Sequence, residues 1–332
     1  MRAFVLTKYK QPLELTEVEE PEVGERDVLI RVEAVGLNQL DEKIRAGEFA
    51  QILPYALPVV LGNDVAGTVI RVGRLVESFR AGDRVFARPD QSRMGAFAER
   101  IAVAEADLAL VPVSVSMAEA ASLPLVALTA WQALVESGHV GPGQKVLIHA
   151  GAGGVGSIAI QLAKHLGALV ATTASAANAD FVRELGADVV IDYRAEDFEA
   201  ILSEYDLVLD SLGGENLAKS LRVLRPGGLV IGISGPPDPT FAKRMGLGVL
   251  VSAAIRMLSR RIRRQAWRLG VAYEFLFMRA DGDQLGRIAT LVDEGVLRPV
   301  VAKTYPFEQI PAALADLAAG GGRGKIVATL ES

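Results

Sequence analysis

The chain has 332 residues, of which 50% are hydrophobic and 23% charged, and its formal net charge is −5. This length predicts two domains, and the negative charge gives no reason to expect nucleic acid as a partner. The absence of cysteine excludes disulfides, thiol catalysis and cysteine-ligated metals. No stretch is long and apolar enough for a membrane span, and Met1–Lys8 is too short a run for a signal peptide, so we expect a cytoplasmic protein without an integral membrane segment.

The first 120 residues or so have the pattern of irregular β structure. Short β-branched or alternating runs at 4–6, 28–32, 65–70 and 84–86 are separated by glycines. No regular alternation of strands with helices is visible here. We therefore expect a β-rich unit separate from the rest of the chain.

From about residue 125 the pattern changes to an α/β one. Six apolar runs predict strands near 145–150, 169–174, 189–193, 205–211, 228–233 and 273–278. Helical segments are predicted after the first, second and fourth of them, at 155–166, 179–185 and 215–224. Strands that alternate with helices indicate a parallel, doubly wound sheet.

A glycine-rich stretch follows the first of these strands and opens its helix. Gly151, Gly153 and Gly156 fit G-x-G-x-x-G, in which the glycines permit a tight turn, close approach of a pyrophosphate and close helix–strand packing. The helix N-terminus adds free N–H groups and a positive dipole end. We therefore predict a dinucleotide site that includes Gly154 and Val155, rather than a plain glycine-rich turn.

The residues after the second predicted strand, where the adenosine ribose would bind, favour NADP(H) over NAD. NAD sites carry an acidic residue about 20 positions after the first glycine, whereas residues 171–178 contain none. Ser175, Asn178 and Tyr193 can instead donate hydrogen bonds to a 2′-phosphate. A cationic partner for the phosphate would be Arg194, or Arg323 or Lys325 in the C-terminal tail. The alternative is that Ser175 and Asn178 only cap the next helix.

Residues from about 240 to 270 form an unusual insert before the sixth strand. Apolar residues recur every three or four positions and predict one helix face: Leu247, Val251, Ala254, Leu258, Ile262, Ala266 and Leu269. Arginines are predicted on the opposite face: Arg256, Arg260, Arg263 and Arg264. Three interpretations stay open, namely a solvated surface helix, an interfacial helix on an anionic membrane or partner, and a cover over the substrate cleft.

Several short stretches carry a resemblance to a known family. Residues 62–67, 127–131, 185–188 and 323–327, together with the glycine-rich turn, resemble the medium-chain dehydrogenase/reductase superfamily over essentially the whole chain. Residues 38–43, 53–55 and 234–239 are similar to its zinc-independent branch of quinone oxidoreductases and NADPH-dependent alkenal and enone reductases. The resemblance implies an α/β protein. A GroES-like β-rich catalytic domain would comprise residues 1–122 and 280–332, and a Rossmann NADP-binding domain with a six-stranded doubly wound parallel sheet would comprise residues 123–279.

The resemblance also bears on metal binding. Zinc alcohol dehydrogenases of the superfamily hold their metal with a Cys and a His at the places where this chain has Asn38 and Asn63. Its three histidines (His139, His149 and His165) all fall in the nucleotide-binding half. We therefore expect no metal, and without a Lewis acid the oxidation of an alcohol is disfavoured. Reduction of an already electrophilic conjugated carbonyl remains accessible.

The implied reaction is hydride transfer from NADPH to an enal, an enone or a quinone, with an enolate as the developing anion. Donors that would stabilise its oxygen are Asn38, Lys43 and Tyr55. Asp41 is a further catalytic candidate. The alternative roles are pinning of a loop for Asn38 and Asp41, exposure to solvent for Lys43, and packing for Tyr55. The expected cofactor contacts beyond the glycine-rich turn and the phosphate residues are Thr129, Leu212, Ile233, Phe275 and Phe277.

Two other functions stay open at this stage. An enoyl-thioester reductase would use the Arg-rich helix for a carrier phosphate, and a non-catalytic NADPH-binding protein would keep only the cofactor site. The expected partner is a small conjugated carbonyl or quinone. The chain is expected to be a monomer or a homodimer, and His149 and Asp210 are expected to be structural.

Overall fold

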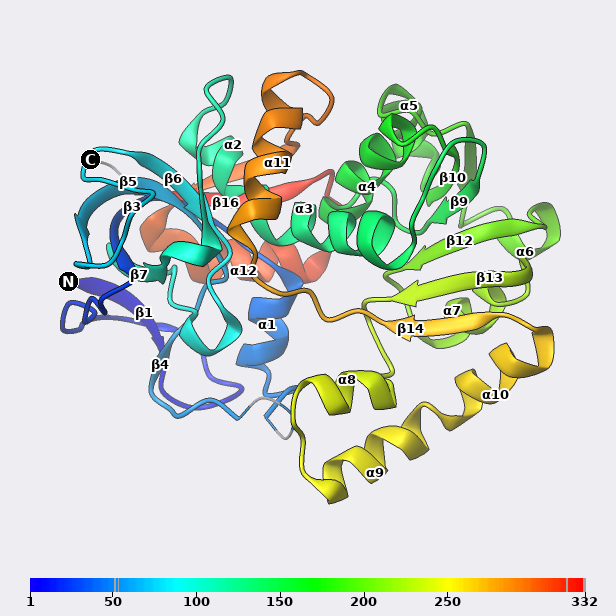
Figure 1. Cartoon of the computed structure of the whole chain (residues 1–332), viewed down its shortest axis with the longest axis horizontal. Helices are drawn as coiled ribbons and strands as arrows, with labels where there is room; N and C mark the ends of the chain where they lie inside the picture. Colours follow the sequence, from blue (N-terminus) through cyan, green and yellow to red (C-terminus); the bar gives the residue numbers. More distant parts are fainter. Residues whose placement is uncertain (51, 53, 321, 331–332) are drawn as a thin grey trace. The chain divides into compact units, whose positions relative to one another are not determined.

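The computed structural model describes residues 1–50, 52, 54–320 and 322–330 (Figure 1). Its internal contacts divide the chain into two compact units, Met1–Leu128 with Arg279–Ser332, and Thr129–Met278. The sequence predicts borders after residues 122 and 279. Helix α3 (Pro124–Trp131) contains the point at which the chain passes from the first unit into the second.

The first unit is rich in β structure. Its strands are β1 (Arg2–Leu6), β2 (Glu14–Glu17), β3 (Asp27–Gly36), β4 (Val59–Val60), β5 (Asp64–Val72), β6 (Arg84–Ala87), β7 (Arg100–Ala104), β8 (Leu108–Leu110), β15 (Val301–Pro306) and β16 (Lys325–Thr329). A seven-stranded sheet has the order β15-β16-β3-β5-β6-β8, with β7 paired to β3, and a smaller sheet has the order β2-β1-β4. Because β16 pairs antiparallel with β3, the C-terminal segment belongs to the same sheet as the N-terminal strands.

The core of this unit is built from its strands. On β3, Val28, Ile30 and Val32 belong to the main core. On the other face Arg31 is exposed but Leu29 is also buried, so most of the strand is covered on both faces. The C-terminal segment contributes to the same core, since the rings of Phe4 and Phe307 lie 5.3 Å apart. The helical segments of the unit are α1 (Gln39–Arg45), η1 (Gln91–Arg93), η2 (Glu105–Asp107), α2 (Met117–Ala121), α11 (Gly282–Asp293), η5 (Phe307–Gln309) and α12 (Ile310–Ala319).

The second unit contains one parallel sheet of six strands. They are β9 (Lys145–Ile148), β10 (Leu169–Ala174), β11 (Val189–Asp192), β12 (Tyr205–Asp210), β13 (Leu224–Gly232) and β14 (Ala272–Phe275). Their order is β11-β10-β9-β12-β13-β14, and every pair is parallel. This is the strand order of the doubly wound dinucleotide fold. The predicted α/β class and the six predicted strands are confirmed.

The remaining elements of the second unit connect these strands. They are η3 (Gln132–Ser137), α4 (Gly154–His165), η4 (Ala176–Asn178), α5 (Ala179–Glu184), α6 (Phe198–Ile201), α7 (Gly214–Ser220), α8 (Pro239–Arg244), α9 (Val249–Leu258) and α10 (Arg260–Leu269). The sequence pattern misses the single-turn helix α6. It also extends the last strand to residue 278, whereas β14 ends at Phe275.

The predicted apolar face of the insert is wrong in part. The buried residues of α9 and α10 are Ile255, Ile262 and Ala266, with Ser259 between the two helices, whereas Leu258 is 67% exposed. Ile262 and Ala266 pack into the core of the second unit. Spacings of four, three and four residues give a narrow stripe. The apolar sequence pattern therefore overestimates the width of the buried face. None of the helices in the described part of the chain has the length and apolar character needed to cross a membrane.

Candidate functional site

The glycine-rich loop between β9 and α4 has two glycines that the protein itself requires. A Cβ on Gly156 would lie 2.3 Å from the carbonyl oxygen of Ala150, and one on Gly151 would lie 2.1 Å from Oγ1 of Thr172. Thr172 is held in place because its hydroxyl donates to the carbonyl of Ile148. Gly151 therefore lets the loop pack on β10, and Gly156 lets α4 pack on the loop.

Gly153 differs from both, because a Cβ at this position would be much less crowded. A Cβ there would meet only the carbonyl oxygen of Ala150, at 3.3 Å, within a 4 Å radius. Gly153 is the N-cap of α4, and Gly154 and Val155 form the first turn, half-buried. The first N–H groups of a helix have no partner inside it. The loop thus presents unobstructed backbone donors, which is the arrangement that binds a pyrophosphate.

The predicted cofactor residues of the second unit lie at one edge of its sheet. The glycine-rich loop follows β9, Ser175 follows β10, and Tyr193 follows β11. Three further residues complete the edge: Leu212 after β12, Ile233 after β13 and Phe275 at the end of β14. Carboxyl ends of parallel strands meet at the same edge, where open α/β sheets bind their ligands.

The residues predicted around a 2′-phosphate are neighbours at this edge. The amide of Tyr193 donates to the carbonyl of Ala174 at 3.3 Å, which joins the ends of β11 and β10. Ser175 and Asn178 stand before η4 and α5, but neither side chain makes a capping hydrogen bond. The guanidinium carbon of Arg194 lies 5.7 Å from the centre of the Tyr193 ring. Of the three cations considered from the sequence, Arg194 belongs to this edge.

Two buried polar residues beside the loop have structural roles. The ring nitrogens of His149 lie 3.2 Å from Oγ1 of Thr173 and 3.0 Å from Oγ of Ser220. Burial lowers the pKa of His149, and the nearby Asp210 carboxylate opposes this shift. Asp210 accepts hydrogen bonds from the amides of Leu212 and Gly213, so it shapes the turn after β12.

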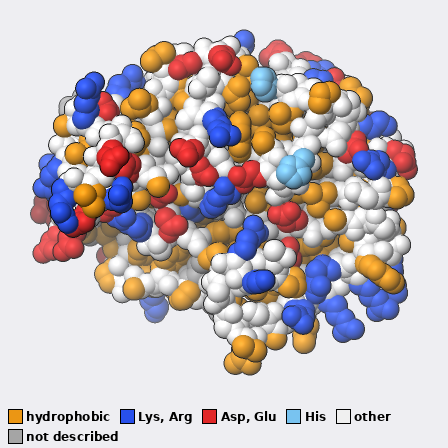
Figure 2. Space-filling model, viewed as in Figure 1, with side chains coloured by type: hydrophobic (Ala, Val, Ile, Leu, Met, Phe, Trp, Pro, Cys, Tyr) orange, Lys and Arg blue, Asp and Glu red, His pale blue; other side chains and the backbone are white. Residues whose placement is uncertain are grey.

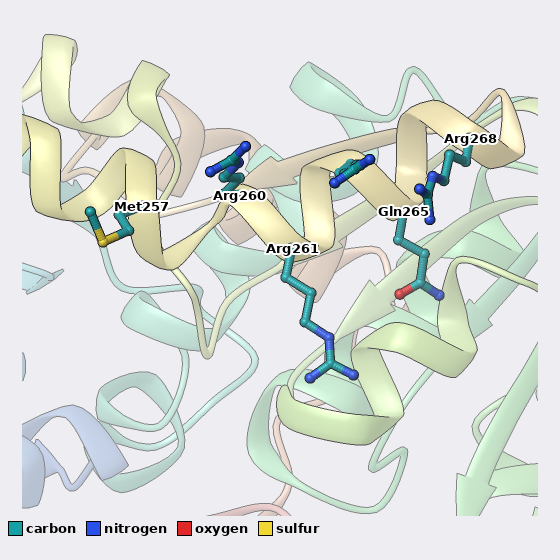
Figure 3. Close-up of a pocket in the computed structure, with 6 residues that line it drawn as sticks. Met257, Arg260, Arg261, Gln265 and Arg268 are labelled. Carbon is teal, nitrogen blue, oxygen red and sulfur yellow. The ribbon is translucent and has the colours of Figure 1, made fainter.

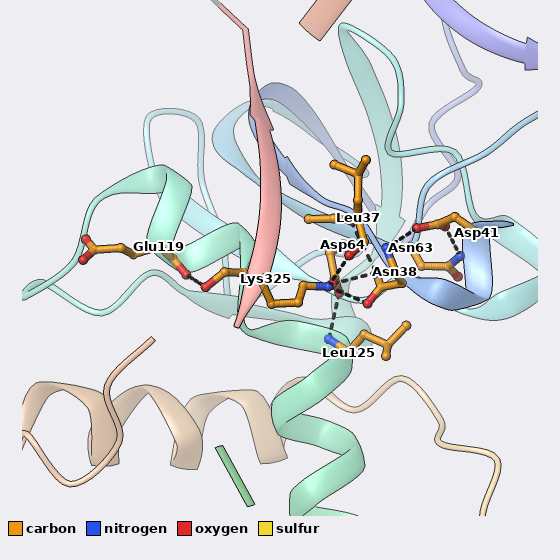
Figure 4. Close-up of polar contacts among 10 residues, drawn as sticks. Leu37, Asn38, Asp41, Asn63, Asp64, Glu119, Leu125 and Lys325 are labelled. Carbon is orange, nitrogen blue, oxygen red and sulfur yellow. Dashed lines mark hydrogen bonds and ion pairs between the residues drawn. The ribbon is translucent and has the colours of Figure 1, made fainter. Parts of the chain in front are cut away.

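The first unit holds a buried polar network centred on Lys325 (Figure 4). The ammonium of Lys325 donates to Oδ1 of Asn38 at 2.5 Å, to the carbonyl of Leu37 at 2.8 Å and to Oδ2 of Asp64 at 3.0 Å. Asn38 Nδ2 donates to the same oxygen of Asp64 at 2.9 Å, and the amide of Leu125 donates to its other oxygen. These bonds tie β16, the start of α1, β5 and the start of α3 together.

This network gives Lys325 partners other than the predicted phosphate. An ammonium group has three donors, and the three acceptors in the chain use all of them. Both polar atoms of the Asn38 side chain are likewise engaged: Nδ2 donates to Asp64, and Oδ1 accepts from Lys325. Asn38 therefore pins the loop after β3, which is the alternative role considered from the sequence.

Asp41 lies next to this network and contacts it through Asn38. Its carboxylate accepts hydrogen bonds from Nδ2 of Asn63 and from the backbone N–H of Asn38, both at 2.7 Å. Burial raises the pKa of Asp41 to about 7, and the two hydrogen bonds and the ammonium of Lys325 oppose that rise. Asp41 holds the first turn of α1 and keeps its carboxylate away from solvent.

The structure reveals a candidate that sequence reasoning misses. Arg88 directly follows β6 and is 1% exposed, and its only hydrogen bond to a described residue runs from Nη1 to the carbonyl of Pro89. Its Nε and Nη2 are buried without a hydrogen-bond partner among the described residues. Burial lowers the pKa of Arg88. An exposed arginine and a buried one look identical in the sequence. Arg88 can therefore be recognised as a candidate only from the structure, by its buried guanidinium nitrogens without partners.

Tyr55 belongs to the same region as Arg88. Burial raises the pKa of Tyr55 to about 12, and the Arg88 guanidinium opposes this rise. The phenol is therefore a neutral donor at every physiological pH. The hydroxyl of Tyr9 is another buried polar atom without a partner among the described residues. Lys43, by contrast, is a half-buried residue of α1.

The donor set around Asn38 and Asn63 does not suit zinc. Zinc prefers thiolate, imidazole and carboxylate ligands, and these two positions provide amides. The ammonium of Lys325 also lies between Asn38 and Asp64, where it would repel a second cation. Among the described residues, no three His, Cys, Asp or Glu side chains are grouped as a metal site requires.

The other predicted cofactor residues have different surroundings. Thr129 is buried in α3. Phe275 is buried with its ring 5.2 Å from that of Phe241, so its side chain is part of a core, whereas Phe277 is half-buried against the same ring. Arg323 is exposed on the turn before β16 in the first unit.

Comparison with known proteins agrees with the fold and with these motifs. Residues 24–113 match the alcohol dehydrogenase GroES-like domain, and residues 185–327 match the family described as zinc-binding dehydrogenase. The chain is 34% identical to the mitochondrial NAD(P)H oxidoreductase RTN4IP1 of Danio rerio, over 92% of this chain and 84% of that protein. It is 35% identical to the chloroplastic NADPH-dependent alkenal/one oxidoreductase of Arabidopsis thaliana, over 92% and 73%.

A solved structure extends this similarity over the full length. The quinone oxidoreductase from Coxiella burnetii matches with a TM-score of 0.87 and 31% identity, over 100% of this chain and 99% of that one. The chain therefore belongs to the medium-chain dehydrogenase/reductase superfamily. It is an NAD(P)H-dependent oxidoreductase, and its relatives are quinone oxidoreductases and alkenal/one reductases.

Proposed function

We propose that the protein is an NADPH-dependent, zinc-independent reductase of small α,β-unsaturated carbonyl compounds or quinones. The observation that carries this proposal is the buried network in which Lys325, Asp64 and Asn38 occupy the region of the superfamily's metal ligands. A substrate reduced here must be electrophilic without a Lewis acid. Conjugated carbonyls and quinones meet that condition, whereas an alcohol would need its proton removed first.

The residues at the sheet edge of the second unit fit NADPH. The amides of Gly154 and Val155 would hold the pyrophosphate, and Ser175, Tyr193 and Arg194 would hold the 2′-phosphate. When bound, NADPH supplies the hydride. The absence of an acidic residue from 171–178 favours the phosphorylated cofactor, because a carboxylate there would repel it.

The protein's contribution to the chemistry would be to stabilise negative charge on the substrate oxygen. Tyr55 and Arg88 are the best candidates, because Tyr55 stays protonated and Arg88 has two buried nitrogens without partners. Donors in a dry environment are more effective at stabilising an enolate than donors in water. Lys43 remains a further candidate, whereas the side chain of Asn38 is already engaged by Asp64 and Lys325.

A substrate panel tests the reaction class. The purified chain is mixed with NADPH and an enal, an enone, a quinone or an enoyl thioester, and with NADP⁺ and a primary alcohol. We expect NADPH oxidation with the first three and no alcohol oxidation, with or without added zinc. Preference for the enoyl thioester would assign the chain to thioester reduction. Absence of turnover with every acceptor, combined with tight NADPH binding, would indicate a non-catalytic protein.

Two substitutions test the proposed donors. Tyr55→Phe and Arg88→Gln should each lower kcat by about 100-fold, the typical effect of losing one oxyanion donor, with little change in NADPH affinity. Tyr305→Phe and Arg80→Gln are matched controls, since Tyr305 bonds to Asp316 at the surface and Arg80 is 90% exposed. Unchanged kcat in both test variants would remove these residues from the mechanism.

A further inference from the structure

The insert that contains α8, α9 and α10 is strongly basic in an acidic protein. Residues 239–273 contain no Asp or Glu, whereas the whole chain has a net charge of −5. The same stretch contains eight basic residues: Lys243, Arg244, Arg256, Arg260, Arg261, Arg263, Arg264 and Arg268. Such segregation of charge indicates attraction to an anionic surface.

Helix α10 carries five of these arginines, and none of them forms an ion pair with a described residue. Arg263 donates to Oγ of Ser259 and to the carbonyl of Arg256. The other four are Arg260, Arg261, Arg264 and Arg268. Together with Met257 and Gln265 they line an open groove of about 550 Å³ (Figure 3). Elsewhere in the second unit, Arg222 and Arg225 pair with Glu199 and Asp206. The arginines of α10 therefore lack neutralising partners that other arginines of the unit have.

Helix α9 exposes large apolar side chains next to this basic groove. Val249 is 85% exposed, Leu250 87%, Met257 77% and Leu258 67%, and Trp267 on α10 is 79% exposed. Figure 2 shows Lys and Arg side chains gathered at the lower right, over α10, with hydrophobic side chains nearby. Exposed apolar residues in one patch mark an interaction surface.

The outward residues follow one line along both helices. Leu250, Met257, Arg261, Arg264 and Arg268 are spaced at multiples of a helical turn. Ser259 hardly interrupts the helical path, because its amide donates to Ile255 and its carbonyl accepts from Arg263. The buried stripe that anchors these helices lies opposite, so the outward line has no role in folding the unit.

We propose that this face, defined by the exposed apolar residues of α9 and the unpaired arginines of α10, binds an anionic lipid surface. A bilayer offers an apolar interior in which Val249, Leu250 and Met257 can be buried. Its lipid phosphates offer the negative charges that the arginines lack within the chain. Twenty helical residues give a line roughly 30 Å long. A straight line of that length suits an extended planar partner. Trp267 lies among the arginines, at the level where an indole ring meets lipid headgroups. This proposal does not depend on the reductase activity.

Vesicle binding by the full chain tests the proposal. Co-sedimentation is measured at about 0.15 M salt with vesicles of phosphatidylcholine alone, and with vesicles of phosphatidylcholine mixed with an equal amount of phosphatidylglycerol. We expect binding to the mixed vesicles only, with a blue shift of tryptophan fluorescence. Equal binding to both vesicle types, or no binding to the mixed vesicles, would overturn the proposal.

Variants separate this face from general charge attraction. The triple variant Arg261→Gln, Arg264→Gln and Arg268→Gln should weaken binding to mixed vesicles on the order of 100-fold. The pair Leu250→Ser and Met257→Ser should weaken it and suppress the fluorescence shift. The matched control, Arg74→Gln, Arg80→Gln and Arg183→Gln, removes three exposed arginines elsewhere and should bind as the unmodified chain does.

Two results would contradict the assignment of this face. One is equal loss of binding in the control and in the triple variant. The other is a concentration-dependent dimer, seen by analytical ultracentrifugation, that the Leu250→Ser and Met257→Ser variant dissociates, because the face would then be covered by a second copy of the chain. NADPH-dependent turnover of a water-soluble acceptor should be unchanged in all these variants, which shows that they fold.

Discussion

The ammonium of Lys325 lies 3.0 Å from the carboxylate of Asp64, and both side chains are almost completely buried, with 6% and 0% exposed. The two residues are 261 positions apart in the sequence. Their pair joins β16 to β5, so the last strand and the first half of the chain depend on each other for charge compensation. Because both side chains are buried, water cannot solvate either charge if its partner is removed.

Removing one partner of this pair should destabilise the first unit strongly. Lys325→Met leaves a buried carboxylate without its cation, and we expect a loss of about 3–5 kcal/mol in the free energy of unfolding. Urea denaturation followed by circular dichroism measures it. The double variant Lys325→Met with Asp64→Asn should recover part of the loss, because no unpaired charge remains. A single variant as stable as the unmodified chain would show that the pair is not closed in solution.

Asp41 should make stability depend on pH near neutrality. The pKa of Asp41 is about 7 in the folded chain, against an ordinary value of 3.8, which we take for the unfolded chain. Because the folded chain holds the proton more tightly, the stability from this group is fully present below pH 3.8 and is lost as the pH rises through about 7. The difference corresponds to a ceiling of roughly 4 kcal/mol.

The variant Asp41→Asn isolates this contribution. Other carboxylates also change stability with pH, so the informative quantity is the difference between variant and unmodified chain from pH 5 to 8, measured by urea denaturation. The unmodified chain should lose stability relative to Asp41→Asn as pH rises. Asp180→Asn is the control, because Asp180 is 94% exposed. Parallel curves for Asp41→Asn and the unmodified chain would refute the raised pKa.

The three motif glycines should respond differently to alanine. Gly156→Ala forces a Cβ against the backbone of Ala150 and Gly151, so we expect a loss of several kcal/mol in stability, on the order of a severe overpacking mutation. Gly153→Ala places its Cβ 3.3 Å from the carbonyl oxygen of Ala150 and no closer to any other atom. It should therefore destabilise the fold far less than Gly156→Ala does, but it should bind NADPH more weakly. Thermal unfolding and cofactor titration separate the two effects. Equal NADPH affinity in Gly153→Ala and the unmodified chain would show that the pyrophosphate does not approach this position.

Ser175 and Arg194 should determine the choice between NADPH and NADH. Ser175→Asp introduces a negative charge beside the 2′-phosphate, and Arg194→Gln removes the nearby cation. Charge-assisted hydrogen bonds contribute roughly 1.5–3 kcal/mol each, so each variant should bind NADPH about 10- to 100-fold more weakly and NADH unchanged. Arg183→Gln on α5 is the control. Calorimetric titration with both cofactors gives the affinities, and an unchanged NADPH affinity in Ser175→Asp would reject the assignment.

Patterns that depend on local chemistry were readable without coordinates. The alternation of strands and helices from residue 145 onward predicts the parallel sheet, because side-chain periodicity follows directly from backbone geometry. Gly151 and Gly156 predict the loop because a Cβ at either position would collide with Thr172 or Ala150, and Gly153 completes the motif. The missing acid in 171–178 and the amides at Asn38 and Asn63 favour NADPH and a metal-free reaction, and both remain predictions.

Features that depend on burial were decided by the tertiary structure alone. Lys325 becomes a partner of Asp64 instead of a phosphate because β16 pairs with β3 and carries it inside the first unit. Arg88 becomes a candidate because folding removes water from its guanidinium and supplies an acceptor to Nη1 but none to Nε or Nη2 among the described residues. Leu258 stays exposed because α9 and α10 are buried along only a narrow stripe. Residue type and spacing are local properties, whereas desolvation and pairing arise only when distant segments meet.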